Sequence, residues 1–141
     1  MKKLLFGFSM LLGLITNAQS YSLTGSNPSY SQDFNSLDTS STVFSSNLPT
    51  GWSILEVGAN SNNQYRGGFG NSTTGDTYSF GSTNNSDRSI GGLASNSLTP
   101  HFGIKFTNNT GSTITSLSVS YKGEQWRVGN TAQHIDSLIF L

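Results

Sequence analysis

Side chains able to carry chemistry are scarce in this sequence, and the most suggestive ones gather in two short stretches. Only 10% of the 141 residues are charged, and there are two histidines. The stretch YKGEQWRVGN sets Glu124, Trp126 and Arg127 within four positions, and NNQYRGGFG sets Tyr65 beside Arg66 in a loop. An aromatic ring can stack on a sugar ring while a guanidinium bonds its hydroxyls. The predicted ligand-binding residues are therefore Tyr65, Arg66, Trp126 and Arg127.

A second interpretation of the same region is structural. Gly123 interrupts the alternation of the predicted strand, as a bulge would, so that Glu124 and Trp126 share one face. If Trp126 points to the core, the Glu124 side chain also points inward and needs a cation as its partner. Arg88 is the candidate. A buried pair adds little net stability, but loss of one partner costs about 3–5 kcal/mol. Arg88 and Glu124 are therefore predicted to form a structural clamp.

Catalytic centres find little support. A serine hydrolase needs a positioned base, but His101 and His134 are isolated and no G-x-S-x-G motif is present. Two such histidines without cysteine cannot supply a zinc site. Glycoside hydrolysis needs two facing carboxylates, and Glu56 and Glu124 lie in different predicted strands. We expect no catalytic residue, no metal centre and no cofactor.

One alternative to that expectation stays open, namely a structural calcium ion. Asp33, Asp76 and Asp87 lie in loops rich in asparagine and carbonyl groups, which suit a hard cation. No EF-hand spacing accompanies them. Aspartates that merely form turns are the simpler interpretation.

The N-terminus predicts export. Residues 1–18 combine two lysines, a short apolar run and a small-residue end, the pattern of a cleaved signal peptide. The run is shorter than the ~20 residues of a membrane span, so no span is expected after cleavage. The mature chain, 19–141, then has five basic against seven acidic residues, a net charge of −2. A sparse basic set of this kind does not favour a nucleic-acid partner.

The elements that must position these residues are predicted to be strands. Short alternating apolar runs recur between Gly, Asn and Ser punctuation, and no helical period follows the signal peptide. The strongest local prediction is an antiparallel pair, with Phe102, Ile104 and Phe106 in one strand and Leu117 and Val119 in the next. We therefore expect an all-β fold, an antiparallel two-sheet sandwich of jelly-roll type. The apolar alternation of HIDSLIFL runs to the end without a turn, so a sandwich incomplete at its C-terminus is expected.

Two longer stretches resemble a known group of proteins. QDFNSLDTSSTVFSSNLPTGWSI is similar to the opening segment of secreted bacterial jelly-roll modules. GDTYSFGSTNNSDRSIGGLAS and NNTGSTITSLSVSYKGEQWR resemble the N-terminal β-sandwich of large secreted multidomain bacterial proteins. Such proteins often carry lamin-tail-like or nuclease/phosphatase-like domains and a C-terminal sorting tail.

The resemblance implies a non-catalytic module on a secreted or surface-exposed protein. Such a module would act in adhesion, in contact with glycans or other cell-surface components, or as a spacer. The alternative is the accessory N-terminal domain of a secreted hydrolase, of nuclease or phosphatase type, whose catalytic domain lies beyond residue 141.

Overall fold

The protein is all-β, as the alternating pattern predicts. The computed structural model describes residues 19–127 and residue 139, and these residues contain no helix. None of the described residues therefore forms a helix long and apolar enough to cross a membrane. The seven strands are β1 (Tyr21–Leu23), β2 (Trp52–Val57), β3 (Tyr65–Gly68), β4 (Asp76–Phe80), β5 (Ser89–Leu93), β6 (Thr99–Ile104) and β7 (Phe106–Asn108).

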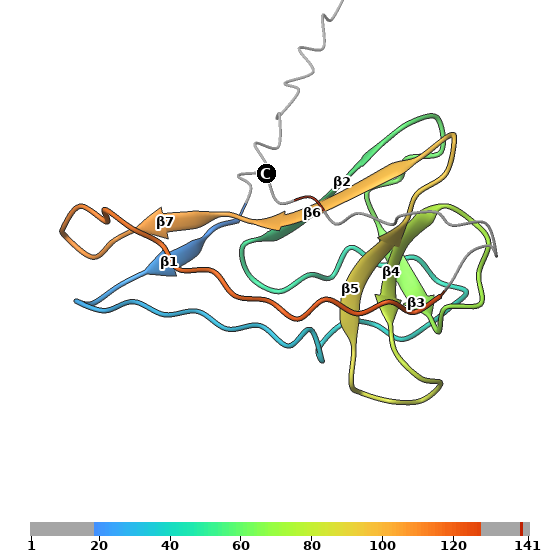
Figure 1. Ribbon diagram of the computed structural model, residues 1–141, viewed down its shortest axis with the longest axis horizontal. Helices are drawn as coiled ribbons and strands as arrows, with labels where there is room; N and C mark the ends of the chain where they lie inside the picture. Colours follow the sequence, from blue (N-terminus) through green and yellow to red (C-terminus); the bar gives the residue numbers. More distant parts are fainter. Residues whose placement is uncertain (1–18, 128–138, 140–141) are drawn as a thin grey trace, which may run out of the picture.

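The strands form three small sheets, of which two contain a parallel pair. The strands β2 and β6 form an antiparallel pair, and β1 and β7 form a parallel pair. In the third sheet β4 is the central strand, parallel to β3 and antiparallel to β5. Figure 1 shows β1 and β7 at one end of the molecule and β3, β4 and β5 at the other. The arrangement is compatible with a β-sandwich, but the prediction of purely antiparallel pairing is wrong.

The core lies where the β2–β6 pair meets the sheet of β3, β4 and β5. Ile54 of β2 faces Phe102 of β6 across their ladder. Both pack with Tyr65 of β3 and Ile90 of β5, and Leu37 from the preceding loop completes the buried cluster. Alternation along β2 and β6 therefore turns one face of this pair inward, as the sequence pattern requires, whereas β4 is buried at four consecutive residues from Asp76 to Ser79.

The predicted hairpin between the Phe102–Phe106 strand and the Leu117–Val119 strand is wrong. Residues 113–127 form no strand, and β7 pairs instead with β1. Aromatic packing favours this partner, because the Phe106 ring lies 6.2 Å from that of Tyr21 and 5.5 Å from that of Tyr30. Edge-to-face aromatic contacts add about 0.5–1.5 kcal/mol each beyond simple burial.

Candidate functional site

Tyr65, the first of the predicted ligand-binding residues, is part of the core. Its side chain is 0% exposed, and its hydroxyl donates to the Asn47 carbonyl at 2.7 Å. The same hydroxyl accepts the backbone N–H of Asp38 at 3.0 Å. A ring with both faces covered and its hydroxyl satisfied cannot stack on a ligand, so the prediction for Tyr65 is wrong.

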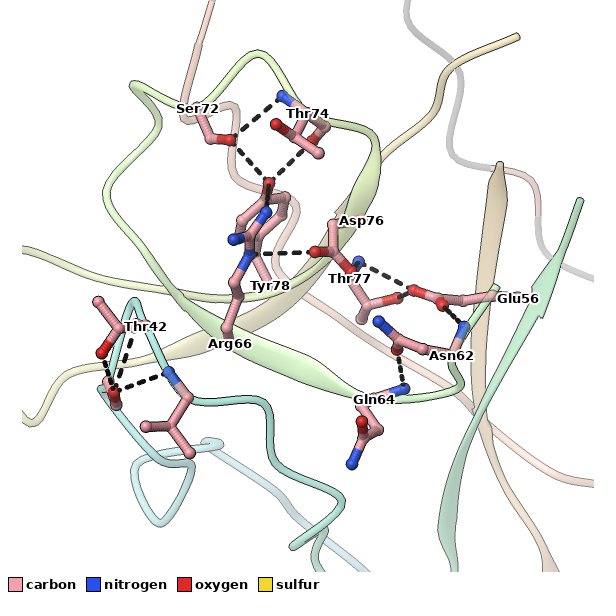
Figure 2. Close-up of polar contacts among 12 residues, drawn as sticks. Thr42, Glu56, Asn62, Gln64, Arg66, Ser72, Thr74, Asp76, Thr77 and Tyr78 are labelled. Atoms are coloured by element: carbon pink, nitrogen blue, oxygen red, sulfur yellow. Dashed lines mark hydrogen bonds and ion pairs between the residues drawn. The ribbon is translucent and has the colours of Figure 1, made fainter. Parts of the chain in front are cut away.

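Arg66, the next residue of β3, points to the opposite face and lies against two aromatic rings. Its guanidinium carbon is 5.1 Å from the centroid of the Phe44 ring and 5.6 Å from that of Tyr78. Figure 2 shows the guanidinium beside the Tyr78 ring and aimed at Asp76. Cation–π contacts of this length are attractive and fix the plane of the guanidinium.

Asp76 neutralises Arg66 from the start of the neighbouring strand. Arg66 Nε lies 3.0 Å from Asp76 Oδ2, and since this nitrogen has no hydrogen-bond partner among the described residues, the contact is an ion pair and not a directed hydrogen bond. Burial raises the pKa of the Asp76 carboxyl above its ordinary 3.8, against the lowering effects of the Thr77 N–H and of Arg66. Desolvation therefore outweighs the attraction of the arginine.

The raised pKa of Asp76 predicts how stability changes with pH. The folded state holds the Asp76 proton more tightly than the unfolded state. Below pH 3.8 the carboxyl group is protonated in both states and costs no stability. Once the pH exceeds the raised pKa of the folded state, the buried carboxylate lowers stability by the full amount. The free energy of unfolding of Asp76→Asn relative to the wild type should therefore rise as the pH rises through this window. Urea unfolding at a series of pH values measures this difference. Thr73→Ala is the control, and its free energy of unfolding should change with pH in parallel with that of the wild type. Parallel curves for Asp76→Asn would contradict the prediction.

From the far end of the described chain, Trp126 reaches β4 and Arg127 reaches the loop that precedes it. The Trp126 ring stacks on Phe80 of β4, with centroids 6.0 Å apart and planes 11° from parallel. Arg127 Nη1 donates to the Ser72 carbonyl at 2.6 Å, and the Ser72 hydroxyl bonds that of Tyr78 at 2.8 Å.

Three of the four predicted ligand residues thus gather on one face of β4. Tyr78 and Phe80 alternate on this strand with their rings 5.3 Å apart, and Tyr78 lies opposite Arg66 in the β3–β4 register. Around them lie two guanidinium groups and a half-buried indole. We call this set the β4 surface, which consists of Arg66, Tyr78, Phe80, Trp126 and Arg127; the Tyr78 ring is buried and supports the other four from within.

The predicted Arg88–Glu124 clamp is wrong, because each residue takes other partners. Arg88 is buried, and its guanidinium donates to the Ser79 hydroxyl at 2.9 Å, to the Ser79 carbonyl and to the Ser82 carbonyl at 3.3 Å. Burial lowers the pKa of this guanidinium below its ordinary value. Glu124 is exposed and pairs with Lys122 at 2.8 Å, a contact that raises the pKa of Lys122.

The carboxylate that does clamp the fold is Glu56. It is 4% exposed and accepts four hydrogen bonds, two on each oxygen. Oε2 receives the N–H groups of Asn62 and Asn63 at 2.8 and 3.1 Å, and Oε1 receives the N–H and hydroxyl of Thr77 at 3.1 and 2.8 Å. Figure 2 shows this carboxylate joining the turn before β3 to β4. The inward direction of Glu56 follows from its alternation with Trp52 and Ile54, and its partners could not be foreseen.

The other residues weighed for catalysis or metal binding are dispersed. Glu56 is buried and Glu124 is exposed on another segment, so they form no facing pair. Asp33 accepts from Asn35 within its own turn, and Asp76 pairs with Arg66. No group of three metal-ligating side chains occurs within residues 19–127. His101 is exposed on β6, while His134 and the predicted signal peptide, 1–18, lie outside the described residues.

Phe44 is the member of this neighbourhood that the sequence did not single out. It lies in the polar stretch SSTVFSS, is 41% exposed and packs against Arg66. The available signal was a single aromatic residue in a polar loop, because such a residue does not pack on the inward face of a strand.

Comparison with known protein families, with curated proteins and with solved structures finds no match.

Proposed function

We propose that this chain is an exported, non-catalytic module of jelly-roll sandwich type that contacts neutral glycans through the β4 surface. The observation that carries the proposal is the gathering of Arg66, Trp126 and Arg127 around Tyr78 and Phe80. Neutral sugars offer apolar ring faces for stacking and hydroxyls for hydrogen bonding. The Trp126 indole supplies a ring for stacking, and the guanidinium groups of Arg66 and Arg127 supply N–H donors in the same neighbourhood.

The charge balance of this surface supports a neutral ligand. Arg66 is already paired with Asp76, and the Arg127 guanidinium donates to a backbone carbonyl. Little free positive charge is left to attract a polyanion, which agrees with the net charge of −2 expected for 19–141. Binding should therefore change little between low and high salt.

Binding of the full chain to neutral polysaccharides (glucan, mannan and galactan) at low and high salt tests the proposal. Trp126→Ala should weaken binding about tenfold, equivalent to about 1.4 kcal/mol, because the stacking ring is removed. Trp126→Phe should keep part of the affinity, since a smaller ring can still stack. Lys105→Ala removes an exposed cation outside the β4 surface and should leave binding unchanged.

Three results would contradict the proposal. The first is the failure of all three polymers to bind a chain whose fold is intact by circular dichroism. The second is binding that Trp126→Ala does not weaken. The third is an affinity that falls steeply with salt, since that dependence indicates an electrostatic partner.

A further inference from the structure

The loop 38–45, which precedes β2 in the chain, is held firmly against β3. Ser45 exchanges two backbone hydrogen bonds with Tyr65, at 2.7 and 2.9 Å, and Ser40 accepts the N–H of Gly67 at 2.6 Å. At the start of the loop, Asp38 donates its N–H to the Tyr65 hydroxyl at 3.0 Å, and its carboxylate accepts the Ser45 hydroxyl. Both ends of the loop are thereby fixed to the buried strand, so its shape is pre-organised.

This loop lines an open hollow of about 430 Å³ on the surface. That volume falls within the roughly 300–1,000 Å³ of small-molecule sites, but the hollow is less enclosed than such sites and would leave part of a bound sugar in solvent. The lining combines carboxylate, hydroxyl and apolar groups from Asp38, Thr39, Ser40, Val43, Phe44 and Ser45.

Two large apolar side chains of the hollow are exposed although the loop is well anchored. Val43 is 63% exposed and Phe44 is 41% exposed. The Phe44 ring is held in place by the guanidinium of Arg66, 5.1 Å from its centroid. Because Arg66 also belongs to the β4 surface, the hollow adjoins that surface.

We propose that this hollow seats one neutral pyranose ring of the glycan, with Phe44 stacking on the ring face and Asp38 accepting its hydroxyls. The inference rests on the proposed function and names the part of the glycan that is recognised. Phe44 offers the apolar contact area and Asp38 the charged acceptor, which makes stronger hydrogen bonds than a neutral one. The hydroxyls of Thr39 and Ser40 can bond further positions of the sugar.

The charge of Asp38 selects against acidic sugars. Neither of the two ion pairs within the described residues involves Asp38, so its negative charge is not neutralised by a neighbouring cation. A uronic acid seated in the hollow would bring a second carboxylate close to it, and like charges at short range repel. The hollow is therefore specific for neutral rings.

The test uses the full chain with the neutral glucan, mannan and galactan and with two polyuronates, polygalacturonate and alginate. Phe44→Ala should weaken binding of the neutral polymer about tenfold. Phe69→Ala is the matched control, because Phe69 is 50% exposed but does not line the hollow, and it should bind like the wild type. Asp38→Asn should weaken binding of the neutral polymers and reduce the difference in affinity between neutral polymers and polyuronates. Circular dichroism and thermal unfolding confirm that each variant is folded, and Phe44→Trp should restore binding.

The results separate this inference from the proposed function. If Trp126→Ala weakens glycan binding but Phe44→Ala does not, the β4 surface binds glycans and the hollow plays no part. Wild-type protein that binds polyuronates as tightly as neutral polymers also overturns the inference, since Asp38 would then exert no selection. If no polymer binds, the proposed function fails and this inference fails with it.

Discussion

Replacing Glu56 by leucine should lower the free energy of unfolding by about 4 kcal/mol. The carboxylate is buried and accepts hydrogen bonds from Asn62, Asn63 and Thr77. Leucine has a similar size but no acceptor, so the buried Thr77 hydroxyl would lose its partner at about 1–3 kcal/mol. The part-buried N–H groups of Asn62 and Asn63 would each lose a hydrogen bond worth about 1 kcal/mol, while the Thr77 N–H keeps Asp76 as an acceptor at 2.9 Å. Since natural domains are stable by only about 5–15 kcal/mol, this loss would be a large part of the total.

Urea unfolding of the full chain measures the effect, and the amides of Asn62 and Asn63 provide a local measure. Hydrogen exchange at these two amides should be faster in Glu56→Leu, because the carboxylate that protects them is gone. Glu124→Leu is the matched control, since Glu124 is exposed, and it should change stability by about 0.5 kcal/mol or less. A Glu56→Leu protein as stable as this control would show that the carboxylate does not clamp the fold.

Gly67→Ala should cost about 3 kcal/mol of stability. A Cβ atom at this position of β3 would collide with the carbonyl of Thr39 and lie 3.1 Å from the carbonyl carbon of Ser40. These are backbone atoms, so the strain cannot be relieved by turning a side chain. The loop 38–45 would have to move, and the 2.6 Å hydrogen bond from Gly67 to Ser40 would break. Overpacking of this kind costs about 1–3 kcal/mol, and the lost hydrogen bond adds to it.

Gly103→Ala is the matched control, because Gly103 also lies within a strand but has no atom within 4 Å of the added Cβ. Its effect should be below about 1 kcal/mol, since alanine only restricts the unfolded chain there. Thermal unfolding of both variants compares them directly. Equal melting temperatures for the two would contradict the close approach of Thr39 to Gly67.

Because the loop lines the hollow, Gly67→Ala should also weaken glycan binding if the hollow is a sugar site.

The positions of some strands could be predicted from this sequence, but their partners could not. β3 lies in a stretch predicted to be a loop, and the strand predicted at Leu117 and Val119 does not form. The alternation in WSILEV and HFGI located β2 and most of β6, and the inward faces of Ile54 and Phe102 followed from it. Side-chain alternation is a local property with a period of two residues, so it is readable from sequence. The predicted hairpin failed because Phe106 pairs with Tyr21, 85 positions earlier in the chain. A turn signal reports only a local preference, which distant packing can overrule.

The site shows the same division between local and distant information. Arg66, Trp126 and Arg127 were selected by residue type, but only the fold brings them to the same strand. Tyr65 and Arg66 are neighbours in sequence, yet alternation sends the first to the core and the second to the β4 surface. Arg88 and Glu124 were predicted to pair because both are charged. In the structure the Arg88 guanidinium donates instead to the hydroxyl and carbonyl of Ser79 and to the carbonyl of Ser82.

The sequence by itself determined the all-β class and the alternation of inward and outward residues along β2 and β6. The scarcity of charge and the isolation of the two histidines were also readable there. The tertiary structure alone decided that Glu56 is the buried clamp, that Asp76 is the partner of Arg66, and that Phe44 stands over a hollow. The reason is physical: burial and hydrogen bonding depend on which distant segments meet, and that choice follows from packing of the whole chain.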